Sequence, residues 1–496
     1  MARRVEEPYE YCLTFIKYTY MAEDKKILLN GVFWNAIQKY SGLVVNIAVS
    51  MVLARLLTPE DFGIVAIATV LISFLTMICD MGIGPAIIQR QDLEQKDLDN
   101  IYSFTLYVGM GLSLLLFVSS WGIANFYQIE QLKFICQILS VVVLFSAMNM
   151  VPNALMTKNF KFREIAKRTL ILQVVSGIIS VIAAFVGAGV YSLLISPIFT
   201  AIGIFFYNRL YFKLSFHLRV GFYSIRKIFS YSAYQFMFKF INFFSANIDK
   251  IIIGKTISPA LLGQYHKAFQ LVQLPLSNVD SVITPVLHPL LAKYQSDKDV
   301  LIERYNKVIG LLALIGVPMG VIMFFCGDVI IRFFYGSQWD IAIPSFKYLS
   351  LAAPLYIILA CCGSFFQASN NTKLLFQLGV INSTVAILAI MICAFYFRTI
   401  EAVALSWCFS MCSNFFWTQF FIYKRILKRS VLDGFKVLLV PLYLGLILSC
   451  LCIVADYIFR DYIYVSLFIK VLSFICILLL GLKKTGYYEF IKNFST

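Results

Sequence analysis

Long apolar segments alternate with short polar ones along the whole chain of 496 residues. Each apolar segment has about 20 residues or more, which an α-helix needs to cross the hydrocarbon core of a bilayer. The runs are continuous rather than alternating residue by residue, so they indicate helices and not an outer-membrane barrel. We therefore predict an all-α polytopic membrane protein with about 14 spans, at residues 32–56, 62–84, 100–124, 132–155, 169–187, 190–208, 229–253, 263–289, 304–326, 343–367, 374–397, 400–423, 434–456 and 463–482.

The composition agrees with this class. Hydrophobic residues make up 60% of the chain and charged residues only 14%, and the charges gather between the apolar runs. A soluble protein of this composition would not stay in solution. The twelve cysteines lie mostly within apolar runs without a C-x-x-C pattern, and there are three histidines, so we expect neither disulfides nor a metal site, and no cofactor.

Lysine and arginine are unevenly shared between the two sets of alternate loops. With the spans above, 30 fall on one side and 6 on the other. The positive-inside rule makes the basic side cytoplasmic, which places both termini in the cytoplasm. Residues 1–30 are then a cytoplasmic extension, either a short interfacial helix or a disordered segment, and Met21 is a second plausible start. The longest loops have roughly 20 residues, so we expect no extramembrane catalytic domain.

A short motif occurs twice, about two hundred residues apart. Thr58-Pro59 is followed by Gly63, and Ser258-Pro259 is followed by Gly263. The residue before a proline is pushed out of the helical region, its hydroxyl can cap the next helix, and proline fits the first helical turn. Glycine permits close approach of another backbone. Each copy therefore predicts a tight turn between two antiparallel helices.

The surroundings of the motif indicate an internal duplication. Residues 31–90 and 231–290, aligned without a gap, share eight identities, among them lysine, aspartate, proline and glycine, which are rare inside membrane spans. We predict an N-lobe over 31–210, a basic linker over 211–228 and a C-lobe over 229–425. Residues 426–496 hold two further spans and a tail. Transporters are often built from two such halves, with the substrate site between them.

One lysine and one aspartate flank each copy of the turn at nearly equal distances. Lys39 lies 20 residues before Pro59 and Asp80 lies 21 after it, and Lys239 and Asp280 repeat this around Pro259. In an antiparallel hairpin both reach a depth of about 30 Å from the turn. The lysines could bind an anionic group, with the aspartates as their partners; alternatively, each pair braces its own hairpin, or the lysines extend to the headgroups.

Neutral polar residues lie at helical spacing from these lysines and aspartates, on the same faces of the predicted helices. A membrane helix turns such a face toward a bundle interior or a watery cavity, because lipid cannot hydrogen-bond it. We predict one shared polar cavity, with polar contacts between helices as the alternative. The candidate cavity residues are Asn35, Gln38, Lys39, Asn46, Asp80, Gln235, Lys239, Asn242, Gln270, Gln273, Ser277 and Asp280, and the hairpin or gating residues are Pro59, Gly63, Pro259, Gly263 and Pro285.

Three smaller expectations concern residues near the predicted periplasmic ends. Asp249 and Lys250 should neutralise each other, and Lys267 should extend to the membrane surface. Trp339 should anchor the chain at the membrane interface.

Several stretches resemble a known family in order and spacing. They are Gly31–Trp34, Ala54–Gly63, Asp80–Ala86, Pro152–Leu155 with Phe160–Arg163, Asn247–Gly254 and Phe334–Trp339. The sequence resembles Wzx-type polysaccharide and O-antigen repeat-unit flippases of the multidrug/oligosaccharidyl-lipid/polysaccharide exporter superfamily. The resemblance implies two six-helix lobes around a central cavity, two extra helices, and translocation of a polyprenyl-diphosphate-linked oligosaccharide across the bacterial inner membrane. With such a substrate, Lys39 and Lys239 would receive the lipid diphosphate, and the neutral polar faces would bind the sugar hydroxyls.

We therefore expect a carrier in the membrane lipid and not an enzyme, with a polysaccharide polymerase and glycosyltransferases as further candidate partners and no nucleic acid. Three alternatives stay open. A multidrug/cation antiporter would favour an acidic cavity, and a lipid II-type flippase would differ only in its substrate. A membrane glycosyltransferase or polymerase would need paired carboxylates or a large periplasmic loop, and neither is found in the sequence.

Overall fold

The computed structural model describes residues 7–218, 221, 223, 240, 243–295 and 297–487. Among them the backbone is helical and contains no strand. The chain folds into two compact units: unit 1 comprises Met1–Leu57 and Ala68–Phe243, and unit 2 comprises Thr58–Ile67 and Phe244–Thr496. Each unit is described separately below. The predicted boundaries of the N-lobe, linker and C-lobe stay predictions.

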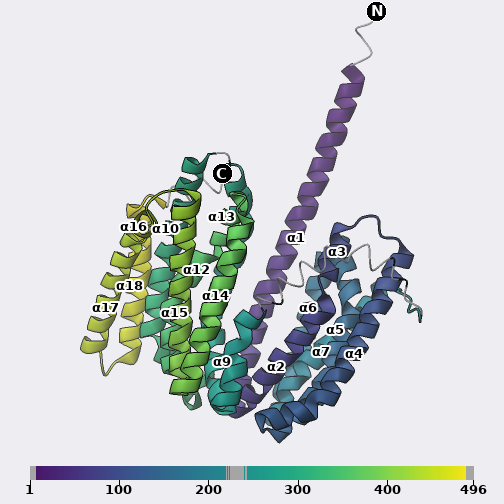
Figure 1. The fold of residues 1–496 in the computed structure, drawn as a ribbon, viewed down its shortest axis with the longest axis horizontal. Helices are drawn as coiled ribbons and strands as arrows, with labels where there is room; N and C mark the ends of the chain where they lie inside the picture. The colour runs from purple at the N-terminus through teal and green to yellow at the C-terminus, as the bar shows by residue number, and fades with distance from the viewer. Residues whose placement is uncertain are drawn as a thin grey trace, which may run out of the picture. The chain divides into compact units, whose positions relative to one another are not determined.

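Unit 1 is a helical bundle in which α4 packs on α5, α1 on α6, and α7 on both α5 and α6 (Figure 1). Its core at α3, α4 and α5 includes Ile87, Ile101 and Val151, all fully buried. Its elements are α1 (Glu7–Leu56), most of α2 (Pro59–Asp80), α3 (Ile83–Gln89), α4 (Gln95–Tyr127), α5 (Glu130–Lys158), α6 (Phe162–Phe185), the 3-10 turn η1 (Gly189–Tyr191) and α7 (Ser192–Tyr211).

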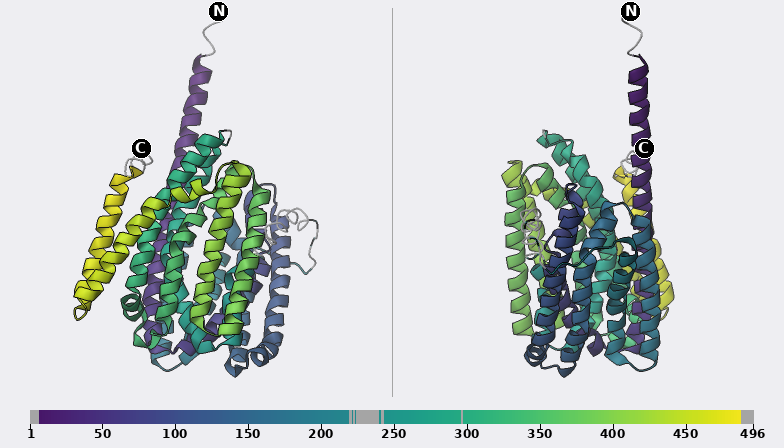
Figure 2. Two further views of the ribbon diagram at one scale, coloured as in Figure 1. Left: turned by 60° about the vertical axis from the view of Figure 1, so that its left-hand side comes forward. Right: turned by 90° about the vertical axis from the view of Figure 1, so that its right-hand side faces the viewer.

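Unit 2 centres on α12, which packs against α9, α10 and α15, while α17 and α18 form a hairpin on α10 (Figure 2). Leu448, Cys452 and Ile477 make the core between that hairpin and α10. Its helices are α9 (Pro259–Ala292), α10 (Lys298–Phe325), α11 (Gly327–Tyr335), η2 (Ser337–Trp339), α12 (Ala342–Ala360), α13 (Cys362–Ala368), α14 (Thr372–Ile392), η3 (Cys393–Phe397), α15 (Ile400–Gln419), η4 (Phe420–Ile426), α16 (Leu432–Lys436), α17 (Leu439–Ile458) and α18 (Ile463–Lys484).

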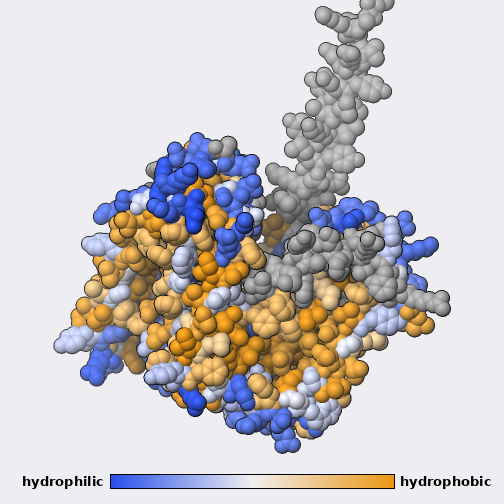
Figure 3. All heavy atoms as spheres, in the orientation of Figure 1, coloured by the Kyte–Doolittle hydropathy of each residue, from blue (hydrophilic) through white to orange (hydrophobic). Residues whose placement is uncertain are grey.

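Eleven helices among the described residues are long and apolar enough to cross a membrane. They coincide with eleven of the predicted spans. The other three predicted spans correspond to α9, to α15 with its π-helical continuation η4, and to 229–253, of which residues 229–239, 241 and 242 lie outside the described part. On the faces that Figure 3 shows, apolar side chains cover the middle of the helices and hydrophilic ones gather at their ends. The chain is thus a multi-pass membrane protein, and the total of 14 spans stays a prediction.

The helices differ from the predicted spans in three places. α1 begins at Glu7, well before residue 32, so the first segment is helical and not a disordered extension. The span predicted over 62–84 breaks after Asp80, where Met81 and Gly82 take left-handed backbone angles with φ of 40° and 75°. α6 begins at Phe162 rather than near 169, which brings several basic residues into the helix.

Candidate functional site

Both copies of the repeated turn start a helix through a side-chain cap. In α9 the Ser258 hydroxyl accepts a hydrogen bond from the Leu261 amide at 3.2 Å, and Pro259 is the first helical residue. In α2 the Thr58 hydroxyl accepts from the Asp61 amide at 3.2 Å, while the Asp61 carboxylate accepts from the Thr58 amide at 3.0 Å. These bonds satisfy amides that have no partner within the helix, and they are the caps that the sequence predicts.

The two turns cross each other at their glycines, and all of this crossing lies within unit 2. A Cβ atom at Gly63 would lie 1.7 Å from the carbonyl oxygen of Pro259, and one at Gly263 would lie 1.9 Å from that of Pro59. The contact is reciprocal, as a local two-fold relation between two equivalent turns would make it. Only glycine fits at either position, because any side chain would overlap the opposite backbone.

An aromatic cluster lies beside the crossing. Trp339 is fully buried and contacts Phe62 edge-on, with ring centroids 5.4 Å apart, and it also packs against Tyr335 at 5.7 Å. The expectation that Trp339 anchors at the membrane interface is therefore wrong. The sequence could not reveal this burial, because Trp339 lies in the loop after α11 and its neighbour Phe62 is far away along the chain.

Lys267 is buried in the same cluster. Its ammonium lies 4.1 Å from the centroid of the Phe62 ring and 5.0 Å from that of Tyr335, and it donates to the Gln270 amide oxygen at 3.4 Å. The side chain is 3% exposed, so it does not extend to the membrane surface as expected. Aromatic faces attract a cation more strongly when water is excluded, which favours a lysine here.

Asp249 is equally buried, and it accepts hydrogen bonds from donors other than the Lys250 ammonium. The carboxylate accepts hydrogen bonds from the Tyr265 hydroxyl at 3.0 Å and from the Lys250 backbone amide at 2.8 Å. The Lys250 ammonium instead donates to the Asn247 side-chain oxygen at 2.9 Å. Asp249 is therefore held by neutral donors, and its main partner comes from α9.

On α1 the structure places three predicted cavity residues at the surface. Asn35, Lys39 and Asn46 are exposed, whereas Gln38 is half-buried. The neighbouring stripe of α1 packs on α6, because a Cβ at Gly42 would lie 2.8 Å from the side-chain oxygen of Gln173. Exposed polar side chains within a membrane span need water, which is the physical argument for a cavity beside α1.

Asp80 is the last residue of α2, directly before the left-handed break at Met81 and Gly82. It is half-buried, and one carboxylate oxygen would lie 3.6 Å from a Cβ at Gly84. A carboxylate is disfavoured near a helix C-terminus, since the helix dipole places negative charge there. The Asp80 carboxylate also lies beside the first turn of α3, whose N-terminus attracts an anion. Its pairing with Lys39 stays a prediction.

The predicted residues of the second repeat are only partly described. On α9, Gln270 and Ser277 are exposed and Gln273 is half-buried, and the Ser277 hydroxyl donates to the Leu274 carbonyl at 3.2 Å. α9 continues through Pro285 and Asp280, whose side chains lie outside the described residues. Lys239, Gln235 and Asn242 also lie outside them, so the shared cavity of the two repeats stays a prediction.

Sequence reasoning missed two buried basic residues. Arg168 was assigned to a loop, yet it is buried in α6, where its guanidinium donates to Asn208; that amide in turn donates to Asn149 at 3.3 Å and Asn153 at 3.1 Å. Lys470 of α18 forms an ion pair with Asp456 at 2.5 Å. A lysine deep in an apolar run signals a partner, and Asp456 is the nearest acidic residue of the preceding helix.

Comparison with solved structures defines the class of fold. The lipid II flippase MurJ in an inward closed conformation matches with a TM-score of 0.70, over 93% of this chain and 100% of that chain, at 17% sequence identity. An inward-facing multidrug resistance transporter of the MATE family, in the MOP superfamily, matches with a TM-score of 0.58, over 78% and 96%, at 14% identity. The fold is that of these polytopic membrane transporters.

The sequence also matches a family model. The model described as polysaccharide biosynthesis protein covers residues 52–344, more than half of the chain, and the chain belongs to this family. TuaB of Bacillus subtilis (strain 168), a teichuronic acid biosynthesis protein, is 27% identical over 71% of this chain and 73% of its own length. WzxC of Escherichia coli (strain K12), a lipopolysaccharide biosynthesis protein, is 21% identical over 84% and 85%. ExoT of Rhizobium meliloti (strain 1021), a succinoglycan biosynthesis transport protein, is 23% identical over 68% of each chain.

Proposed function

We propose that this protein is a flippase that moves polyprenyl-diphosphate-linked oligosaccharide repeat units across the bacterial inner membrane by alternating access. One observation carries the proposal: a chain of the polysaccharide biosynthesis family has, over 93% of its length, the fold of a flippase for a lipid-linked precursor. The protein is then a carrier and not an enzyme. A polysaccharide polymerase and glycosyltransferases would act before and after it.

In this proposal the two lysines of the repeats, Lys39 and Lys239, receive the diphosphate. A phosphate prefers cationic donors, and a lysine at mid-membrane is costly unless it has an anionic partner or water. Asp80 and Asp280 are the proposed partners that hold the lysines when no substrate is bound. The sugars would contact neutral polar groups in a wet cavity, and exposed Asn35, Asn46 and Gln270 support such a cavity.

A lipid II-type flippase is the second candidate, because the fold match to MurJ is the specific observation in its favour. The two candidates differ in the sugar and not in the lipid diphosphate. A multidrug antiporter has weaker support, since the exposed Lys39 would repel the cationic drugs that such a cavity concentrates.

The proposed topology places both termini in the cytoplasm and the loop after α11 in the periplasm, as the 30 to 6 distribution of basic residues indicates. Ser337 is exposed in that loop. A cysteine at Ser337 should therefore react with a membrane-impermeant maleimide added to intact spheroplasts. Reaction only after the membrane is opened would invert the topology.

The experiment that tests the function removes both lysines in a host that depends on this chain for its surface polysaccharide. The Lys39→Ala/Lys239→Ala variant should make no surface polymer, accumulate lipid-linked precursor on the inner leaflet and keep its normal protein level. Lys373→Ala is the matched control, because Lys373 is an exposed cation in the first turn of α14, outside the proposed cavity. Normal polymer in the double variant would rule out the proposed role of the lysines.

A second arm separates the two candidate substrates. The wild-type chain should restore polymer in cells without a repeat-unit flippase and should fail to support cells depleted of their lipid II flippase. The opposite pattern would assign it to lipid II.

A further inference from the structure

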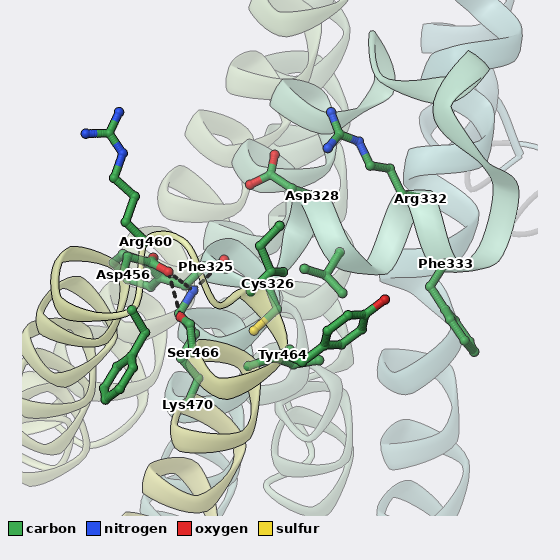
Figure 4. Close-up of a pocket in the computed structure, with 14 residues that line it drawn as sticks. Phe325, Cys326, Asp328, Arg332, Phe333, Asp456, Arg460, Tyr464, Ser466 and Lys470 are labelled. Atoms are coloured by element: carbon green, nitrogen blue, oxygen red, sulfur yellow. Dashed lines mark hydrogen bonds and ion pairs between the residues drawn. The ribbon is translucent and has the colours of Figure 1, made fainter.

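A cavity of about 690 Å³ lies in unit 2 between the α10–α11 junction and the hairpin of α17 and α18 (Figure 4). Its size falls within the range of small-molecule sites in proteins. None of its lining residues belongs to the polar faces of α1, α2 and α9 that the proposed transport function uses. The proposed transport function therefore does not account for this cavity.

The inner wall of the cavity carries a half-exposed carboxylate. Oδ1 of Asp456 lies 2.5 Å from the Lys470 ammonium and accepts a hydrogen bond from the Ser466 hydroxyl at 2.9 Å. The Lys470 side chain is 7% exposed, but that of Asp456 is 48% exposed. Both bonds use Oδ1, which leaves Oδ2 able to accept a hydrogen bond from a ligand.

The rim of the cavity adds charges of both signs. Asp328 pairs with Lys347 of α12 at 2.7 Å, and its side chain is also about half exposed. Arg332 is held by Asp340 through two bonds of 2.9 Å. Arg460, by contrast, is exposed and makes no ion pair with any residue that the structure describes. The cavity thus offers carboxylate acceptors and one uncommitted guanidinium.

The cavity lies at the level of the lipid headgroups. The turn between α17 and α18 presents three largely exposed tyrosines, Tyr457, Tyr462 and Tyr464, and Tyr464 also lines the cavity (Figure 4). Exposed tyrosines at the ends of membrane helices mark the boundary between hydrocarbon and headgroups. Phe325 and Phe333 also line the cavity, and aromatic rings attract a cation.

We propose that this cavity binds the headgroup of a zwitterionic aminophospholipid. The primary ammonium donates to Oδ2 of Asp456 and lies against the aromatic lining, while the phosphate pairs with Arg460. An anionic phosphatidylglycerol fits less well, because its glycerol hydroxyls are neutral donors and make weaker hydrogen bonds to a carboxylate than an ammonium does. A choline headgroup has no N–H to donate to the carboxylate. The bound lipid would fasten the α17–α18 hairpin to α10, and the site is independent of the transported substrate.

Native mass spectrometry of the purified full-length protein tests this site. The protein is exposed to equal amounts of phosphatidylethanolamine, phosphatidylglycerol and phosphatidylcholine. We expect wild type to retain one phosphatidylethanolamine in preference to the other two, by about tenfold, which is what one charge-assisted hydrogen bond contributes. The double variant Asp456→Asn/Lys470→Met should lose that preference. Arg460→Gln should retain less of all three lipids, because each carries the phosphate that Arg460 pairs with.

The double variant replaces both members of the buried pair, since removing only one would leave an unpaired charge. Its matched control is Asp433→Asn/Lys436→Gln, which removes an exposed ion pair elsewhere in unit 2, and Lys373→Gln is the control for Arg460. Both controls should retain the wild-type preference. Arg460→Gln changes an exposed side chain and tests the phosphate contact even if the double variant does not fold. Equal retention of the three lipids by wild type, or undiminished lipid retention by Arg460→Gln, would overturn the proposal.

Discussion

A single methyl group at Gly63 tests whether the two crossed turns separate during transport. In Gly63→Ala the new Cβ would lie 1.7 Å from the Pro259 oxygen, whereas ordinary contacts begin near 3.4 Å. The two backbones must therefore move apart by about 1.7 Å, the difference between these distances. Inserting a methyl group into such close packing costs about 1–3 kcal/mol. That energy shifts an equilibrium between crossed and separated turns by roughly 5- to 150-fold.

The shift can be measured from outside the cell, because the proposed topology places the crossing on the periplasmic side. A cysteine introduced at Ala260 reports on the turn next to Gly263, and the same chain without that cysteine gives the background. In Gly63→Ala a membrane-impermeant maleimide should label this cysteine at least several-fold faster than in the parent. Surface polysaccharide should fall at the same time, since alternating access needs the crossed state as well.

Two further variants make the result specific. Gly263→Ala should reproduce the effect, because its Cβ would lie 1.9 Å from the Pro59 oxygen. Gly379→Ala in α14 is the matched control, since a Cβ there meets no atom within 4 Å, and it should label and transport like the parent. Unchanged labelling together with normal transport in both Gly63→Ala and Gly263→Ala would refute the reasoning that the crossing gates the periplasmic side.

The remaining predictions concern the cap, an ion pair and the second repeat. Ser258→Ala should lower stability by about 1 kcal/mol through loss of the α9 cap; thermal unfolding in detergent checks this against Ser277→Ala, and equal midpoints would contradict it. A hydrogen bond from the Arg332 guanidinium lowers the pKa of Asp340. The pair therefore stabilises the folded protein fully above the ordinary carboxyl pKa of about 3.9. This stability is lost as the pH falls through the lowered pKa of Asp340 and its carboxylate is protonated. The thermal unfolding midpoint of Asp340→Asn should therefore be lower than that of wild type at neutral pH and approach it in acid. A difference that does not change with pH would argue against the pair. Exchanging Lys239 with Asp280 should restore part of the polymer lost in Lys239→Asp, and no restoration would argue against their pairing.

Much of the fold follows from the sequence because lipid imposes one strong rule. Every backbone group in hydrocarbon must be satisfied within the helix, so a long apolar run has only one available conformation. The predicted spans were wrong where an apolar run does not stay helical. The break after Asp80 depends on the left-handed angles of Met81 and Gly82, and apolar periodicity does not report such single-residue angles.

The start of α6 was missed for a different reason. Arg163, Lys167 and Arg168 look like a cytoplasmic loop, but Arg168 is buried and donates to Asn208 of α7, which in turn donates to two asparagines of α5. A buried arginine needs such partners. They come from residues 15 or more positions away, which no local pattern identifies. The same holds for Lys267, whose partner Phe62 lies in the first copy of the turn.

The candidate cavity could be predicted only as a set of helix faces. Counting residues from a turn gives the depth of a charge, and this places Lys39 level with Asp80. The hairpin of α17 and α18 shows how far depth alone can mislead. Asp456 lies two residues before the end of α17, whereas Lys470 lies seven residues into α18, yet the two pair at 2.5 Å. The long lysine side chain spans the difference in depth. Equal depth is therefore neither required nor sufficient for pairing, and which helix faces meet decides it, so the paired-charge hypothesis for the two repeats needs the charge-exchange experiment.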